Sequence, residues 1–231
     1  MAVNKEAYLQ IKKELEVKNV TLVAVSKTKP VSDVMELYEL GQRDFGENYV
    51  QELVEKAEQL PKDIRWHFIG HLQSNKVKYI APFVHLIHGV DSEKLLKEIN
   101  KQAAKLNRTI DVLLQIHIAK EETKFGLDEE ELNLTIGQFE NLKMENVNLQ
   151  MANVRICGLM GMASFSEDLD LVRREFEFLK NLFDKYANLQ ISNFKFQILS
   201  MGMSGDYKIA TEEGSTMVRI GSLLFGARNY A

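Results

Sequence analysis

Apolar segments alternate with helical patterns along this chain, and that alternation restricts its fold more than any other feature. Several of the apolar segments are continuous rather than alternating, as expected of strands that are covered on both faces in a parallel sheet. Eight segments have strand character: 21–27, 43–48, 65–71, 85–92, 110–118, 154–163, 194–203 and 216–226. The chain therefore consists of repeated β–α units.

This repetition predicts one α/β domain over residues 1–231, folded as a single (β/α)₈ TIM barrel. A doubly wound open sheet is the alternative. It needs fewer strands and typically carries a glycine-rich sequence after its first strand. Here the first strand is followed by "SKTKP" (26–30) instead, which favours the barrel.

Three helices are predicted between the strands. The first spans 31–41, from just after Pro30 to Gly41, and the second spans 91–106 and begins with an Asp-Ser capping signal. The third, 166–189, has a stripe that we interpret as core packing: Leu169, Val172, Phe176, Leu179, Phe183 and Tyr186. We expect two more helices within 119–153.

Composition excludes several classes of function. A net charge of −4 with dispersed Lys and Arg gives no basic surface for nucleic acid. The polar N-terminal segment lacks a signal peptide pattern, and no apolar run is long enough to cross a membrane. The one cysteine, Cys157, cannot form an intramolecular disulfide, and its apolar surroundings indicate a small buried hydrophobe. We expect a cytoplasmic protein.

Lys27 follows the apolar run Leu22–Val25, where a buried strand reaches the surface. In a parallel barrel, active sites form where strands end. With strand alternation, Val23, Val25 and Lys27 share one face. If that face lines the barrel mouth, partial desolvation favours the neutral, nucleophilic amine that Schiff-base chemistry needs. The alternative is a lysine that only extends into solvent.

The segment 199–228 contains the second candidate feature. Ser204 is a possible N-cap for a short helix that ends at Gly214, and "RIGS" (219–222) lies within the last predicted strand. Loops after the seventh and eighth strands of barrels commonly hold a phosphate. Gly221 permits close backbone approach, and hydroxyl donors are available from Ser200, Ser204 and Ser222. Ordinary turn residues would give a similar pattern.

Arg219 lies between Val218 and Ile220 in an apolar strand, so its guanidinium needs a buried acceptor, either a structural carboxylate or a ligand atom. Together with Lys27 and the Ser/Gly loops, this indicates a phosphate-anchored ligand whose carbonyl meets a lysine. Two ligands fit: pyridoxal 5′-phosphate, or a sugar phosphate in an aldolase of the Schiff-base class.

Other polar residues are weaker candidates. His67 and His71 lie in a strand pattern without a matching acidic pair, so we predict no metal site. His85, His88 and His117 are interpreted as core or strand-end residues. The charge runs "EKAEQL" (55–60) and "DEEELNL" (128–134) are interpreted as solvated helix faces.

The chain resembles the pyridoxal-phosphate homeostasis proteins, which are related to the N-terminal barrel of alanine racemase. The resemblance is carried, in order along almost the whole chain, by "LVAVSKTKP", "GQRDFGENYVQE", "WHFIGHLQSNK", "GLMGMAS", "LSMGMSGD" and "STMVRIGSLLFGARNY". It implies that Lys27 is the Schiff-base lysine, that Asn48 lies beside the cofactor, and that Arg219 faces the pyridine nitrogen. Ser200, Ser204, Gly221 and Ser222 would surround the phosphate.

The resemblance implies a protein that holds pyridoxal phosphate reversibly, with apo-enzymes as transient recipients, rather than an enzyme. An arginine at the pyridine nitrogen weakens the ring as an electron sink. The sequence ends after the last predicted strand, so we expect no C-terminal racemase domain and no second acid/base tyrosine from it. A small amino-acid racemase is the alternative, and a lone barrel is expected to be a monomer.

Overall fold

The computed structural model describes residues 3–121, 124–144, 152–187 and 194–226, and within them a closed parallel barrel with strand order β1 to β8. The strands are β1 (Thr21–Val25), β2 (Asp44–Glu47), β3 (Arg65–Phe68), β4 (Leu86–Val90), β5 (Ile110–Ile116), β6 (Val154–Gly161), β7 (Phe194–Ser200) and β8 (Met217–Ile220). The barrel predicted from the sequence is confirmed, and the open sheet was the wrong alternative.

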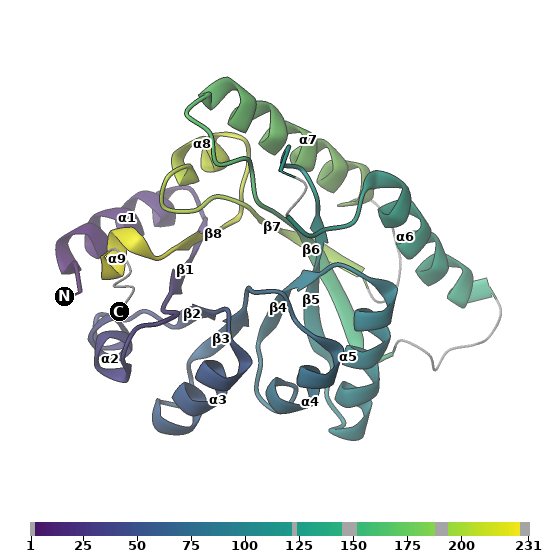
Figure 1. The fold of residues 1–231 in the computed structure, drawn as a ribbon, viewed down its shortest axis with the longest axis horizontal. Coiled ribbons are helices and arrows are strands. Elements are labelled where there is room, and N and C mark those ends of the chain that lie inside the picture. Colours follow the sequence, from purple (N-terminus) through teal and green to yellow (C-terminus); the bar gives the residue numbers. More distant parts are fainter. Residues whose placement is uncertain (1–2, 122–123, 145–151, 188–193, 227–231) are drawn as a thin grey trace.

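The helices lie outside the strands (Figure 1). They are α1 (Lys5–Val17), α2 (Val31–Glu39), α3 (Val50–Gln59), the 3₁₀ turn η1 (Ser74–Lys76), α4 (Val77–Ile80), α5 (Glu93–Lys105), α6 (Glu129–Met144), α7 (Leu169–Ala187), α8 (Tyr207–Glu212) and α9 (Ser222–Phe225). Ser92 caps α5, its hydroxyl accepting from the Leu95 N–H at 3.4 Å. The three helices predicted at 31–41, 91–106 and 166–189 are confirmed: α2 and α5 are slightly shorter than predicted, and α7 begins three residues later, with 188–189 outside the described residues.

Pairing of β1 with β8 closes the barrel, and its register places side chains in two separate cores. Leu22 and Ala24 belong to the large core between strands and helices, whereas Val23 belongs to the smaller core inside the barrel. Val23 pairs with Arg219, which therefore points into the barrel interior as well. Cys157 lies in this inner core, where burial raises the pKa of its thiol to about 11. Its predicted role as a small buried hydrophobe is confirmed.

The C-terminal part differs from the prediction in two ways. β8 ends at Ile220, and residues 222–225 form α9 instead of continuing the strand. Helix α8 begins at Tyr207 with Asp206 as its N-cap residue, so the predicted capping role of Ser204 is wrong. The first error arises because the apolar segment on both sides of Gly221 is short enough to suit either structure. The second arises because serine is as common in turns as at helix caps.

Two smaller expectations also need correction. Leu169 is 60% exposed because it is the first residue of α7, whereas the other members of the predicted stripe are buried. Of the two helices expected within 119–153, the described part contains α6, and residues 122–123 and 145–151 lie outside the described residues.

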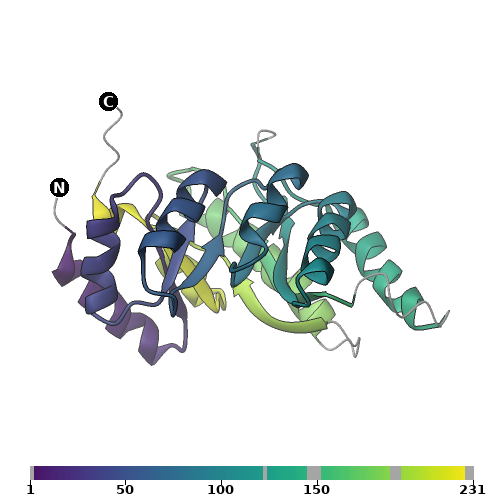
Figure 2. The ribbon, with the colours of Figure 1, turned by 90° about the horizontal axis from the view of Figure 1, so that it is seen from below.

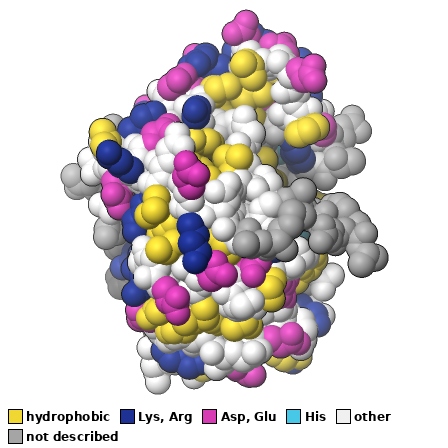
Figure 3. All heavy atoms as spheres, turned by 90° about the vertical axis from the view of Figure 1, so that its left-hand side faces the viewer, with side chains coloured by type: hydrophobic (Ala, Val, Ile, Leu, Met, Phe, Trp, Pro, Cys, Tyr) yellow, Lys and Arg dark blue, Asp and Glu magenta, His cyan; other side chains and the backbone are white. Residues whose placement is uncertain are grey.

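Helices α1 and α9, from opposite ends of the described chain, lie side by side (Figures 1 and 2). The Asn4 N–H donates to the Leu224 carbonyl oxygen at 2.8 Å and ties them together. On this side of the molecule, basic and acidic side chains are interspersed (Figure 3). None of the helices in the described ranges is long and apolar enough to span a bilayer.

Candidate functional site

A pocket of about 370 Å³ opens at the carboxyl ends of the strands, where the loops that follow β1, β2, β3, β6, β7 and β8 meet. Six of the seven residues predicted for the site line it: Lys27, Asn48, Ser204, Arg219, Gly221 and Ser222. The seventh, Ser200, lies behind the pocket wall and contacts Arg219. The topology therefore gathers residues from distant parts of the sequence into one cavity.

Lys27 reaches this pocket from the loop that follows β1. β1 ends at Val25 and Lys27 lies in the turn that follows, so the predicted continuation of the strand to Lys27 is wrong. Val25 and Lys27 nevertheless line the same pocket. Lys29 lines the pocket too, but its ammonium donates to the Phe225 carbonyl oxygen at 2.7 Å. Lys29 therefore ties this loop to α9, whereas Lys27 lies nearer to the strand end.

Arg219 is the buried cation of the pocket wall, with 4% of its surface exposed. Its Nη1 donates to the carbonyl oxygen and to Oγ of Ser200, at 2.8 and 2.7 Å, and its Nη2 donates to the Gly161 carbonyl oxygen at 3.0 Å. Burial lowers the pKa of the guanidinium to about 10, which leaves it charged at neutral pH. Among the described residues its hydrogen-bond acceptors are neutral oxygens, so two of its five N–H groups are available to a ligand.

The loops after β7 and β8 form the part of the pocket that suits a phosphate. The Gly221 N–H donates to Ser204 Oγ at 3.3 Å, which joins the two loops. A Cβ at Gly221 would lie 3.2 Å from the Val25 carbonyl oxygen, so glycine permits the close approach of this loop to β1. Within the described chain, no hydrogen bond uses the backbone N–H groups of Ser204, Gly205 and Ser222. These three donors suit an anionic group.

Asn48 follows β2 directly and forms another part of the rim. Its Oδ1 is buried and has no hydrogen-bond partner in the described part of the chain. Gly70 explains its position, because a Cβ there would lie 2.4 Å from the Asn48 carbonyl oxygen. An unpaired buried acceptor beside a pocket indicates a place for a ligand donor or a water molecule.

Sequence reasoning missed several lining residues. The apolar wall is made by Ile69, Met162 and Phe165, which carry no signal that separates them from core residues. Asp206 lines the pocket as well, and burial raises the pKa of its carboxyl. Its Oδ1 accepts from the Met203 N–H at 2.5 Å, so it holds the loop after β7 in place.

A buried ion pair lies behind the loop that carries Lys27. Lys56 is 4% exposed, and its Nζ donates at 2.7 Å to Glu47 Oε1, to Glu52 Oε1 and to the Ser26 carbonyl oxygen. Ser26 Oγ also donates to Glu47 Oε1, at 2.6 Å, and the Thr28 N–H donates to Glu52 at 2.6 Å. The prediction that residues 55–60 form a solvated helix face is therefore wrong for Lys56. This cluster fixes both sides of Lys27.

Glu47 makes the stability of the protein depend on pH. Burial raises the pKa of its carboxyl to about 7, against the attraction of Lys56 and the hydrogen bond from Ser26. The native state then binds this proton more tightly than the unfolded state does, so the contribution of Glu47 to the free energy of unfolding falls as pH rises from about 4.5 to about 7. We expect the Glu47→Gln variant to show a flatter pH dependence in this window. Urea unfolding at pH 5 and 7.5 tests this, and an equal difference from wild type at both pH values contradicts it.

Comparisons with known proteins agree with the barrel fold. Residues 5–229 match the family model for the alanine racemase N-terminal domain. Alanine racemase from Streptomyces lavendulae superposes with a TM-score of 0.70 at 14% identity, covering 93% of this chain and 55% of that one. That likeness concerns the fold alone.

Closer relatives cover most of both chains. The pyridoxal phosphate homeostasis protein of Aquifex aeolicus is 42% identical over 210 residues, 90% of this chain and 87% of the relative. The human protein of that name is 41% identical over 221 residues, 91% of this chain and 77% of its own. PipY of Synechococcus elongatus, whose structure was determined with PLP bound, superposes with a TM-score of 0.83 at 33% identity over 96% of this chain and 99% of that one. The chain belongs to the family of pyridoxal phosphate homeostasis proteins.

Proposed function

We propose that this protein binds pyridoxal phosphate in the pocket at the carboxyl ends of the strands and keeps it in reserve as part of vitamin B6 homeostasis in the cytoplasm. The observation that carries the proposal is the convergence of Lys27, Arg219 and the unused backbone donors of the loops after β7 and β8 on one cavity of about 370 Å³. PipY, with PLP bound, supports the same ligand.

Each part of the pocket has a task in this proposal. The Lys27 amine would condense with the aldehyde to a Schiff base with loss of water. Hydrolysis, or exchange with another amine, would reverse this linkage and so permit both storage and release. The backbone N–H groups of Ser204, Gly205 and Ser222 receive the phosphate. Arg219 offers one of its remaining N–H groups to the pyridine nitrogen. Asn48 lies at the rim, beside the ring.

The proposal includes storage without efficient turnover, by a single-domain monomer that passes the cofactor to apo-enzymes. When bound, pyridoxal phosphate supplies an electron sink whose strength depends on protonation of its ring nitrogen. Arg219 donates hydrogen bonds but does not give up its proton at neutral pH, so it leaves that nitrogen largely unprotonated. The described residues that line the pocket include no tyrosine or histidine that would exchange protons with a substrate.

The test is to mix the purified protein with pyridoxal phosphate, record the absorption spectrum, reduce with borohydride and map the labelled peptide by mass spectrometry. We expect a yellow band and a label on Lys27, without racemisation of D- or L-alanine by the loaded protein. Absence of the band, or a label scattered over surface lysines, would contradict the proposal and favour the alternative, a Schiff-base aldolase that binds a sugar phosphate. Steady racemisation would show that the protein is an enzyme and would contradict storage without turnover.

A further inference from the structure

Two buried histidines inside the barrel have no part in the proposed pocket, yet they connect to it. His67 on β3 is 1% exposed and His88 on β4 is fully buried. His67 Nδ1 lies 2.9 Å from His88 Nε2, and His88 Nδ1 lies 3.1 Å from Ser200 Oγ. Ser200 Oγ in turn accepts from Arg219 Nη1 at 2.7 Å. At the other end, His67 Nε2 lies 3.0 Å from Asp44 Oδ1. We call these five residues the buried hydrogen-bond chain.

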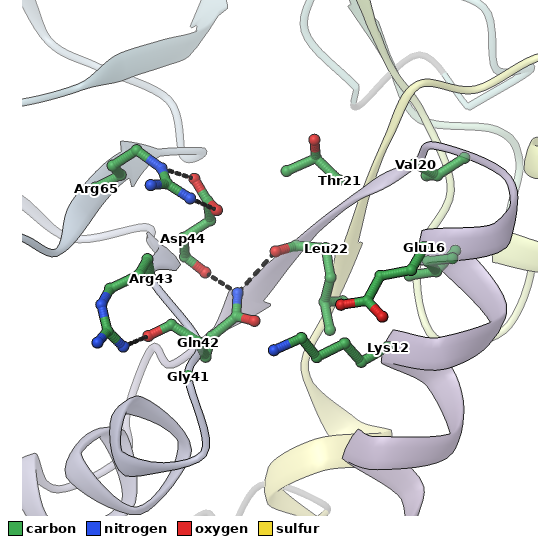
Figure 4. A pocket seen from close by; sticks show the side chains of 11 residues that line it. Lys12, Glu16, Val20, Thr21, Leu22, Gly41, Gln42, Arg43, Asp44 and Arg65 are labelled. Carbon is green, nitrogen blue, oxygen red and sulfur yellow. Dashed lines mark hydrogen bonds and ion pairs between the residues drawn. The ribbon is translucent and has the colours of Figure 1, made fainter.

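The buried hydrogen-bond chain crosses the barrel from end to end. Asp44 and Arg65 begin neighbouring strands and line a pocket of about 200 Å³ at the amino ends of the strands, opposite the Lys27 pocket. Figure 4 shows both Asp44 oxygens facing the Arg65 guanidinium, and Arg65 Nε donates to Oδ1 at 2.7 Å. Arg219 forms the other end of the buried hydrogen-bond chain and lines the Lys27 pocket.

Asp44 sets the direction of every hydrogen bond in this chain. Hydrogen bonds from His67 and Arg65 outweigh burial and lower the pKa of Asp44 to about 2, so at neutral pH its carboxylate can only accept. His67 must therefore place a proton on Nε2. If His67 is neutral, its Nδ1 accepts from His88 Nε2–H, and His88 Nδ1 then accepts from the Ser200 hydroxyl.

In this arrangement every donor hydrogen of the buried hydrogen-bond chain has an acceptor. The Ser200 hydroxyl donates to His88 and its lone pairs accept from Arg219 Nη1. In the opposite arrangement His67 is an imidazolium, His88 Nδ1–H donates to Ser200, and the Ser200 hydrogen has no acceptor among the described residues. Burial lowers the pKa of His88 well below its ordinary value and the Arg219 charge acts in the same direction, so His88 is neutral in both cases.

We propose that His67 and His88 are positioning residues, which hold the Ser200 hydrogen toward His88 Nδ1 so that the Ser200 lone pairs face Arg219. Arg219 is then held by three oxygens, and its two remaining N–H groups keep one orientation toward the Lys27 pocket. Neither histidine touches that pocket. Only the identity of the ligand that Arg219 meets there rests on the proposed function.

The first experiment uses the protein without cofactor. Long-range ¹H–¹⁵N correlation spectra report which imidazole nitrogens carry protons, and the His67→Gln and His88→Gln variants assign the signals. We expect both histidines to be neutral with the proton on Nε2. An imidazolium at His67, or a proton on Nδ1 of either histidine, overturns the proposal.

The second experiment follows the Nε–H signal of Arg219 in the same samples. His67→Leu removes the acceptor of His88 and the donor to Asp44, whereas His67→Gln can supply both from its amide. We expect the Arg219 signal to shift or broaden in His67→Leu and to keep its wild-type position in His67→Gln. An Arg219 signal that His67→Leu leaves unchanged overturns the proposal.

Pyridoxal phosphate binding then links this chain to the pocket. We expect an affinity loss of about tenfold for His67→Leu, as for the loss of one hydrogen-bond partner, and about wild-type affinity for His67→Gln. His85→Gln is the matched control, because the His85 ring lies 5.4 Å from the His67 ring but outside the chain. Equal affinity of wild type and His67→Leu contradicts the positioning role. If wild type itself does not bind, the proposed function fails, and the spectra still decide the role of the histidines.

Discussion

The Lys27→Ala variant should lose covalent loading by pyridoxal phosphate completely and still fold. Lys27 is partly exposed and follows β1, so truncating it enlarges an open pocket instead of creating a cavity in the core. We therefore expect it to lose no more than about 1 kcal/mol of its free energy of unfolding. The yellow band and the labelled peptide should both disappear. The remaining phosphate donors should still bind the cofactor weakly and non-covalently, which equilibrium dialysis measures.

The matched control is Lys29→Ala, two residues further along the same loop. Its ammonium is hydrogen-bonded to the Phe225 carbonyl oxygen, so this variant loses a contact with α9 but keeps the proposed linkage. We expect it to retain the band and the label. If Lys27→Ala keeps the band and Lys29→Ala loses it, the site is correct but the lysine is Lys29. If both variants keep it, the cofactor binds elsewhere.

The strands and the composition of the site could be predicted from local sequence. A buried parallel strand needs a continuous apolar run, and Leu22–Val25 shows it directly. Since strands of a barrel all end at one rim, residues directly after such runs must meet. Lys27 and Asn48 are the examples, and both line the pocket. Predicting which residues lie at this rim thus required only the barrel topology and the positions at which the strands end.

The buried polar groups could not be predicted, because their environment comes from partners distant in sequence. Lys56 lies in a charge run that reads as solvated, yet Glu47 and the Ser26 carbonyl oxygen bind it in the interior. His67 and His88 look like isolated strand histidines until β3 and β4 pair and place them 2.9 Å apart. Ser204 was predicted as a helix cap because serine occurs both in turns and at helix N-caps, and the local sequence does not separate the two.

Replacing Lys56 should give the largest loss of stability among the variants considered. Among the described residues, the Lys56 ammonium is the cation that pairs with Glu47, and Glu47 is fully buried with its Oε2 unpaired. Removing one partner of a buried ion pair typically costs about 3–5 kcal/mol. Without Lys56, which lowers the pKa of Glu47, the carboxyl must take up a proton at pH 7.5 or stay charged in the interior, and both cost free energy. We expect the Lys56→Met variant, which keeps the side-chain length, to lose that much free energy of unfolding at pH 7.5 in urea.

Lys97→Met on α5 is the matched control for this loss. Lys97 also pairs with a glutamate four residues earlier, Glu93, at 2.5 Å, but both side chains are largely exposed. Exposed pairs of this kind contribute about 0.3–0.5 kcal/mol, so a far smaller loss is expected there. Lys56 also holds the Ser26 carbonyl oxygen and Glu52, which receives the Thr28 N–H, so Lys56→Met should loosen both sides of Lys27 and slow or weaken loading. Equal losses in the two variants would mean that the Glu47–Lys56 pair is solvated in the native state and does not position the lysine.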